Sequence, residues 1–205
     1  MDQDGAASFV FQLRLLQRAI THAAPPWPTA DRSAFCDFAA GGDENVLAVR
    51  DGDYVRVVAA WRDPDTVAAA SRFIREFRNA GLPAGLIFAD EGGLGRPMVD
   101  HLASMGWHIN RVNFGSKAYQ AIYENRVSEM WHEAAGAVAR GEIRIGNDDI
   151  LVAQLSSRRS KVSGCGRLGL ESKDDLKRRG GASPDRADAV CGAWTCRSPF
   201  APRAY

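Results

Sequence analysis

The chain has 205 residues, of which 45% are hydrophobic and 25% charged, so it is long enough to bury one substantial core. Its formal net charge is only +1, so no overall positive field indicates a nucleic-acid partner, and a surface for such a partner must come from local clustering of cations. No apolar run reaches the roughly 18 residues of a membrane-spanning helix, and Asp2 and Asp4 stand where a targeting leader is basic, so we expect a cytoplasmic protein without membrane contact.

The N-terminal segment predicts an amphipathic helix followed by a stiff linker. Within residues 9–23, apolar side chains recur at helical spacing, at Val10, Leu13, Leu16 and Ile20. The prolines that follow, Pro25, Pro26 and Pro28, prevent the helix from continuing. We therefore expect residues 1–32 to form a helix and a proline-rich linker that precede the main domain.

The sequence changes to strand character from residue 33. Apolar residues over 33–39 predict a strand, and residues 40–45 have the composition of a turn. Residues 45–61 predict two further strands joined at Asp51 and Gly52, a pair that favours a tight hairpin. We expect these three strands to form an antiparallel meander.

Helices and strands alternate after the meander. Asp63 and Pro64 predict the start of an amphipathic helix that ends before Gly81. Residues 84–90 predict a fourth strand, and a second helix precedes a fifth strand over 107–114. A meander followed by alternating helices and strands predicts an α/β fold with a mixed sheet and helices on its faces.

The last third of the sequence predicts more helix around an irregular middle. Residues 123–140 predict a helix with an apolar side in the core and a polar side that carries Arg126 and Glu129. Residues 147–179 are less regular, and a last helix over 185–194 precedes a flexible tail over 197–205. We expect one domain over residues 33–196.

Four acidic residues stand in these predicted elements at positions that need an explanation. Asp37 interrupts an apolar strand, where an ionised carboxylate is costly unless it is paired or bound to a cation. Asp90 ends the fourth strand, and the carboxyl ends of strands are where sites assemble in open α/β sheets. Asp185 and Asp188 share one face of the last helix, although Asp185 also suits the helix dipole alone.

The order and context of these acids resemble one known family. The stretches concerned are FCDFAAGGDENVLAVRDG, LIFADEGGLGRPMVDHL, NRVSEMWHEAAGAVARGEIRI and LESKDDLKRRGGASPDRADAV, which run from about Phe35 to Trp194. They resemble the nuclease domain of the phage terminase large subunit, in the ribonuclease H-like or RuvC-like superfamily. The resemblance implies a ribonuclease H-like fold and a metal-dependent endonuclease that cuts double-stranded DNA with low sequence specificity during viral genome packaging.

The resemblance also implies a role for each acid. It assigns Asp37, Asp90 and Asp188 as the catalytic, metal-binding carboxylates and Asp43 and Asp185 as further metal-site residues. Such a set suits two Mg²⁺ or Mn²⁺ ions about 4 Å apart, one of which activates water while the other stabilises the leaving oxygen. Our hypothesis is that Asp37 bridges both ions, Asp90 holds one and Asp188 holds the other.

Neighbouring residues leave two alternatives open. Glu44 competes with Asp43 for a supporting role, whereas Glu91 is better explained as a solvated side chain. The glycines after Asp90, at positions Gly92, Gly93 and Gly95, permit either a close approach of the DNA backbone or simply a tight turn from strand to helix.

Positive charge gathers late in the sequence. Charge runs are usually solvated helix faces, but a site that cuts phosphodiesters needs nearby cations to position the backbone. We expect DNA phosphate to be bound by Arg158, Arg159, Lys161, Lys173 and Arg186. Lys173 is the strongest single candidate, because the resembling family shares its Glu-Ser-Lys segment.

Other functions and partners stay open at this stage. A structure-selective, junction resolvase-like nuclease shares the predicted fold, and a non-catalytic packaging-assembly module would dock a portal protein or a small terminase subunit. The phosphate-binding pattern of Gly, four residues, and Gly-Lys-Ser or Gly-Lys-Thr is absent, so an ATPase motor would have to be a separate or missing domain. The chain is then either a fragment of a longer terminase or a stand-alone nuclease of the bacterial host cytoplasm.

Overall fold

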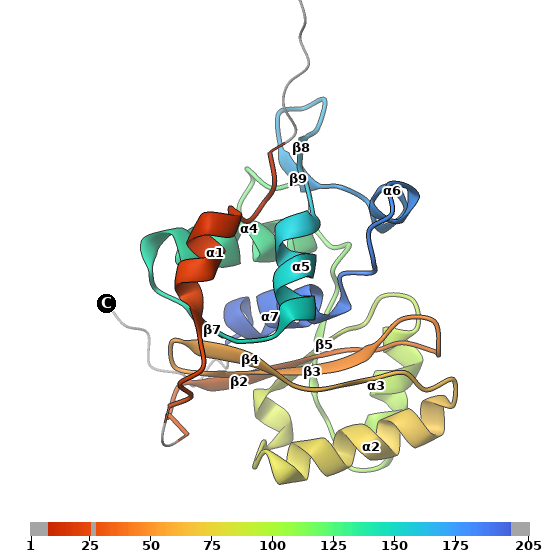
Figure 1. Ribbon diagram of the computed structural model, residues 1–205. Helices are drawn as coiled ribbons and strands as arrows, with labels where there is room; N and C mark the ends of the chain where they lie inside the picture. The colour runs from red at the N-terminus through yellow and green to blue at the C-terminus, as the bar shows by residue number, and fades with distance from the viewer. Residues whose placement is uncertain (1–7, 26–27, 198–205) are drawn as a thin grey trace, which may run out of the picture.

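A computed structural model describes residues 8–25 and 28–197 of the chain (Figure 1). The strands of its main sheet are β1 (Ile20–Thr21), β2 (Arg32–Asp37), β3 (Asn45–Asp51), β4 (Tyr54–Trp61), β5 (Ile87–Asp90), β6 (Asn110–Val112) and β7 (Arg144–Gly146). The α-helices are α1 (Leu13–Ala19), α2 (Thr66–Asn79), α3 (Gly95–Ser104), α4 (Arg126–Arg140), α5 (Asp149–Ser157), α6 (Lys173–Arg178) and α7 (Asp185–Thr195). A short 3₁₀ helix (Ala84–Leu86) precedes β5, and β8 (Ser160–Val162) and β9 (Leu168–Leu170) form a separate hairpin.

The main sheet has seven strands in the order β1-β7-β4-β3-β2-β5-β6. Helices α2 and α3 cover one face, and α1, α4, α5 and α7 cover the other (Figure 1). Each layer of helices buries its own apolar cluster against the sheet. The mixed sheet flanked by helices that the sequence predicts is therefore confirmed.

The predicted meander is confirmed as β2, β3 and β4. These strands pair in antiparallel fashion, and the turn between β3 and β4 places Gly52 at a φ of 65°, in the left-handed region that favours glycine. The remaining neighbours pair in parallel: β5 with β2, β6 with β5, β7 with β4, and β1 with β7. Within the main sheet, all strands except β3 thus point the same way, and their carboxyl ends meet at one edge of the sheet.

The N-terminal segment differs from its prediction. The helix covers only Leu13–Ala19, and the next two residues form β1 at the edge of the main sheet. Leu16 lies fully buried in the core that α4 and α7 share. The segment before residue 33 therefore belongs to the same sheet and core as the rest, while residues 1–7, 26–27 and 198–205 lie outside the described structure.

Two predicted helices are present with changed details. Helix α2 is capped by Asp65, whose side chain accepts hydrogen bonds from the N–H groups of Val67 and Ala68, and not by Asp63. Helix α4 buries Arg126 and Glu129, which the sequence places on a solvated side, because Glu129 accepts hydrogen bonds from the preceding loop and pairs with Arg126 at 2.6 Å. In the described part of the chain, no helix is long and apolar enough to cross a membrane.

Helix α7 lies directly on the sheet, against β2, β3 and β4. Gly192 makes this close packing possible, since a Cβ atom there would lie 2.4 Å from the ring of Phe35 on β2. The first turns of α7 carry Asp185 and Asp188. The packing of a glycine on a strand therefore brings two acids of the last helix toward the edge where β2 ends.

Candidate metal centre

Asp37 and Asp90 end two adjacent parallel strands. Cys36 of β2 lies opposite Ala89 of β5 in the sheet register, so the next residue of each strand is one of these acids. Both carboxylates therefore stand at the shared carboxyl edge of the sheet; the sequence predicts a strand end at Asp90 but places Asp37 inside its strand. This edge is where sites form in open α/β sheets.

The Asp37 side chain is half-buried, and one of its carboxylate oxygens is incompletely satisfied. Among the described residues, its Oδ2 atom is buried without a hydrogen-bond partner. Burial raises the pKa of Asp37 well above its ordinary range; the charge of Lys173 opposes this, while the neighbouring carboxylates raise the pKa further. A carboxylate with a buried free oxygen and acidic neighbours is a position that a divalent cation would stabilise.

The Asp90 carboxyl is held by the backbone around it. Its Oδ1 atom accepts a hydrogen bond of 2.9 Å from the N–H of Phe114, in the loop after β6. Burial raises the pKa of Asp90, and hydrogen bonds from the backbone of Phe114 and Gly92 partly offset this. The ring of Phe114 stacks on Phe35 with centroids 5.4 Å apart, so the loop that holds Asp90 is itself anchored on β2.

The glycines after Asp90 serve the turn. A Cβ atom at Gly95 would lie 1.8 Å from the carbonyl oxygen of Asp90, so only glycine allows α3 to begin there. A Cβ atom at Gly92 would lie 2.9 Å from Asp90 Oδ2. Gly95 is thus explained by a tight turn, whereas Gly92 keeps the space beside the carboxylate clear.

Asp188 is the most deeply buried acid of the group. Its Oδ1 atom accepts hydrogen bonds from Trp131 Nε1 at 2.7 Å and from Arg158 Nη1 at 3.1 Å. Its Oδ2 atom lies 2.9 Å from the ammonium of Lys173. Burial alone would raise the pKa of Asp188, but the charges of Lys173 and Arg158 outweigh it and hold the pKa below the usual value.

Asp185 faces the loop after β2. Its Oδ1 atom accepts a 2.6 Å hydrogen bond from Ser183, and its Oδ2 atom accepts one of 2.9 Å from the N–H of Glu44. The ammonium of Lys173 lies 3.8 Å from Asp185 Oδ1. Burial raises the pKa of Asp185, although these hydrogen bonds and the charge of Lys173 act against the rise.

A lysine stands among these acids. The charge of Asp188 raises the pKa of Lys173, and the charge of Asp37 adds to the rise. Within residues 8–25 and 28–197, no three Asp, Glu, His or Cys side chains are grouped closely enough to hold a metal ion as they stand. The described arrangement is a set of converging carboxylates whose charge one ammonium partly balances.

Comparison with known proteins identifies the fold. No protein-family model and no curated protein sequence matches the chain, but solved structures do. The nuclease domain of the large terminase subunit gp2 of bacterial virus Sf6 matches with a TM-score of 0.66 and 18% identity, over 92% of this chain and 99% of that one. The large terminase nuclease from thermophilic phage G20c matches with a TM-score of 0.65 and 16% identity, over 91% and 97% of the two chains. The same phage nuclease with bound magnesium matches with a TM-score of 0.67 and 14% identity, over 94% and 98%.

This chain has the fold of phage large terminase nuclease domains. The predicted ribonuclease H-like architecture is thereby confirmed, and so is the predicted resemblance at the level of fold. Other solved structures of these terminase nucleases contain manganese, calcium, cobalt or zinc.

Three further acids near the site, the predicted supporting residue Asp43, its competitor Glu44 and Glu91, lie beside cations. Asp43 lies 3.2 Å from the ammonium of Lys177, and its side chain is 42% exposed. Glu44 forms a bidentate ion pair with Arg186, and Glu91 lies 4.0 Å from Arg111. Neither Asp43 nor Glu44 contacts the four converging aspartates through its side chain among the described interactions, so their metal-site role stays a prediction.

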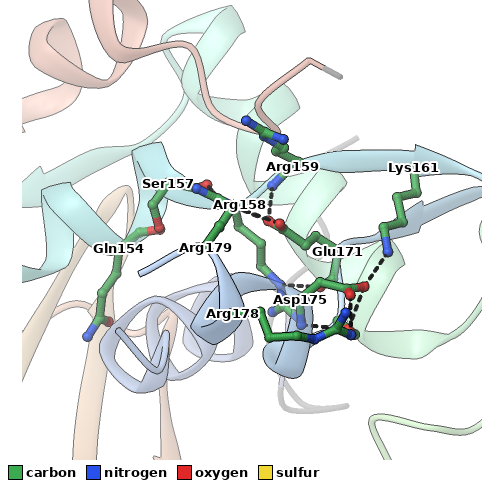
Figure 2. Close-up of polar contacts among 10 residues, drawn as sticks. Gln154, Ser157, Arg158, Arg159, Lys161, Glu171, Asp175, Arg178 and Arg179 are labelled. Carbon is green, nitrogen blue, oxygen red and sulfur yellow. Dashed lines mark hydrogen bonds and ion pairs between the residues drawn. The ribbon is translucent and has the colours of Figure 1, made fainter. Parts of the chain in front are cut away.

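The predicted DNA-binding cations are mostly paired with acids. Arg158 is buried just before the β8–β9 hairpin, and Figure 2 shows the side chain of Lys161 reaching Asp175, 2.7 Å away. Arg186 is held between Glu44 and Asp148. Because Arg158 is buried against Asp188, its position does not fit the phosphate contact that the sequence predicts for it.

Trp131 is the residue of the site that sequence reasoning missed. Its place on the apolar side of α4 predicts only a core side chain, and it is indeed fully buried. The signal available in the sequence was chemical: a buried indole usually directs its N–H at a hydrogen-bond acceptor. Here the acceptor is Asp188.

Proposed function

We propose that this chain is a metal-dependent nuclease that cuts double-stranded DNA with low sequence specificity during packaging of a phage genome. The fold it shares with phage terminase nucleases supports this assignment. The observation that carries it is the convergence of Asp37, Asp90 and Asp188 at one sheet edge, with the buried Oδ2 atom of half-buried Asp37 left without a hydrogen bond in the described structure. A fold without catalysis has no physical need for such carboxylates.

The donor set fits hard divalent cations. Carboxylate oxygens suit Mg²⁺ or Mn²⁺ better than softer metals, and we assign Asp37, Asp90 and Asp188 as the residues that would hold two such ions. When bound, the ions supply an activated water and neutralise charge on the leaving oxygen of the phosphodiester. Asp185 supports the site from beside it, because it fixes the loop after β2 through the N–H of Glu44.

A different set of cations is available to DNA. Arg62 directly follows β4, Arg96 lies in the first turn of α3, and Lys117 lies in the loop after β6. All three are exposed and follow strand ends at the edge that carries Asp37 and Asp90. In the described part of the chain none of them forms an ion pair. We assign them to the phosphate backbone, together with Lys173, which is half-exposed beside the acids.

Cleavage of supercoiled plasmid in Mn²⁺ tests the proposal. The wild-type chain should nick and linearise the plasmid, EDTA should stop the reaction, and Asp37→Asn and Asp188→Asn should each lower the rate by at least about 1,000-fold. Asp100→Asn, which changes an exposed aspartate of α3, should cut at the wild-type rate. Cleavage that survives in Asp37→Asn and Asp188→Asn would overturn the site assignment.

Cleavage of other DNA substrates and Mn²⁺ calorimetry distinguish the proposed function from the two alternatives. A packaging nuclease should cut linear duplex of any sequence, whereas a resolvase-like enzyme should prefer a four-way junction over a matched duplex. A non-catalytic module should neither cut DNA nor take up Mn²⁺ in calorimetry.

A further inference from the structure

The two oxygens of Asp188 face different surroundings. Oδ1 faces the protein interior and accepts from Trp131 Nε1 at 2.7 Å and Arg158 Nη1 at 3.1 Å. Oδ2 lies 2.9 Å from Lys173 Nζ, an ammonium that also lies 3.8 Å from Asp185 Oδ1. The side chain of Asp188 has no exposed surface, so its orientation is decided by these neighbours alone.

Both donors to Oδ1 are fixed in place. Trp131 is fully buried and packs edge-on against Phe11, with ring centroids 5.8 Å apart. The Arg158 guanidinium lies 4.9 Å above the Trp131 ring, and its Nε donates to the carbonyl oxygen of Glu171 at 3.1 Å. A planar guanidinium held at both Nε and Nη1 has little freedom to turn.

The carbonyl that anchors Arg158 is itself held by a network (Figure 2). The Glu171 carboxylate accepts from Arg179 at both oxygens, at 2.7 and 2.8 Å, and from the N–H of Arg159 at 3.2 Å. Arg179 also donates to the carbonyl oxygen of Ser157 at the end of α5. The end of α5, the base of the hairpin and the end of α6 are thereby joined behind Asp188.

We propose that Trp131 and Arg158 are positioning residues that fix the Asp188 carboxylate, so that Oδ1 stays with the protein and Oδ2 alone is presented to a divalent cation. This inference rests on the proposed function, since it concerns the ligand geometry of that metal centre. Neighbours of this kind, which hydrogen-bond a ligand without touching the metal, commonly alter metal affinity by about 10- to 100-fold when removed.

Charge effects alone predict the opposite change in metal affinity, that is, tighter binding when these donors are removed. The Arg158 charge and the Trp131 N–H both draw electron density from Asp188, so their loss would strengthen cation binding if charge were all that mattered. A positioning role predicts weaker binding, because the freed carboxylate can turn away. The direction of the change in Mn²⁺ affinity therefore separates the two accounts.

The experiment is calorimetric titration of Mn²⁺ into the metal-free protein without DNA, with the Mn²⁺ electron paramagnetic resonance spectrum as a second readout. Trp131→Phe keeps a buried ring and removes the donor, and we expect about 10-fold weaker binding and an altered spectrum. Trp61→Phe is the matched control, because the Nε1 atom of buried Trp61 has no hydrogen-bond partner in the described structure. That control should bind Mn²⁺ as the wild type does.

Arg158→Lys keeps the charge but replaces the two-ended guanidinium with one ammonium, so it should also weaken binding. If Trp131→Phe does not fold, the Mn²⁺ affinity of Arg158→Lys tests the positioning role instead. Unchanged or tighter Mn²⁺ binding in a folded Trp131→Phe or Arg158→Lys protein would overturn the inference and leave the proposed function standing. A wild-type protein that binds no Mn²⁺ would overturn the proposed function, and the inference with it.

Discussion

The proposed metal ligand Asp37 should lower the stability of the metal-free fold. Burial raises its pKa, so the folded state disfavours the ionised form, and the free energy of unfolding falls as the pH rises above the ordinary aspartate range. Asp37→Asn removes this charge. Without metal, we expect the free energy of unfolding of the variant to be about 1 kcal/mol higher than that of the wild type. Substitutions that relieve an unfavourable functional site commonly stabilise a protein by this amount.

Chemical denaturation near neutral pH in EDTA measures this difference. Asp100→Asn, at an exposed position, should leave stability unchanged within error. A metal-free Asp37→Asn protein that is clearly less stable than the wild type would show that Asp37 has a structural partner instead.

Gly92 offers a second prediction about single residues. A methyl group there would lie only 2.9 Å from Asp90 Oδ2, which is too close, so the carboxylate would have to shift. We expect Gly92→Ala to lower the rate of plasmid cleavage by about 10-fold or more, because small displacements of reacting groups reduce rates steeply. Gly85→Ala is the matched control, since a Cβ atom at Gly85 would meet nothing within 4 Å. Equal cleavage by both variants would count against a role for Asp90 in the reaction.

The sequence could identify acids but not their partners. Asp37, Asp90 and Asp188 stand out because a charge in an apolar strand or helix face needs a reason that a single sequence can reveal. The partners of Arg158 and Arg186 lie far from them in the chain, at Asp188 and at Glu44 and Asp148. Pairing of this kind depends on the tertiary fold, so a cluster of cations in sequence did not predict which of them reach solvent.

Among the elements, α7 determines how closely its own acids approach the acids at the ends of β2 and β5. Its backbone approaches β2 at Gly192, where a Cβ atom would lie 2.4 Å from the Phe35 ring. Gly192→Ala should therefore destabilise the fold by about 1–3 kcal/mol through overpacking and reduce cleavage by moving Asp188. Gly136→Ala, within α4, meets only the end of the flexible Arg140 side chain and should be neutral or slightly stabilising.

Thermal unfolding of the two glycine variants, alongside cleavage assays, tests the role of this helix. If Gly192→Ala is as stable and as active as Gly136→Ala, the close contact between α7 and β2 does not position the site.

Element length explains which parts of the fold could be predicted. The meander and helices α2 and α4 are long enough for apolar periodicity and caps to identify them. Strands β7, β8 and β9 have three residues each, which is too short for a pattern, so the sequence predicts only a less regular segment where the hairpin lies. Strand β1 was hidden because its two residues continue the helical spacing of α1.

For the whole molecule, the proposed metal centre would join elements that are far apart in the chain. Strands β2 and β5 and helix α7 each supply a carboxylate, so a bound cation should stabilise the fold as a unit. At about 100 times the dissociation constant of Mn²⁺, the free energy of unfolding should rise by about 2.7 kcal/mol. Differential scanning fluorimetry should show a melting temperature higher by about 5–10 °C, reversed by EDTA and absent in Asp37→Asn. An equal shift in Asp37→Asn would place the bound cation elsewhere.

The central claim is that these carboxylates form a divalent metal centre. Anomalous difference density from a crystal soaked in Mn²⁺ tests it most directly. We expect two peaks among Asp37, Asp90 and Asp188, with the Oδ2 atom of Asp188 toward the metal and Oδ1 still bound by Trp131. Full occupancy of Mn²⁺ at other residues, with these three carboxylates free of metal in a protein that cuts DNA, would contradict it.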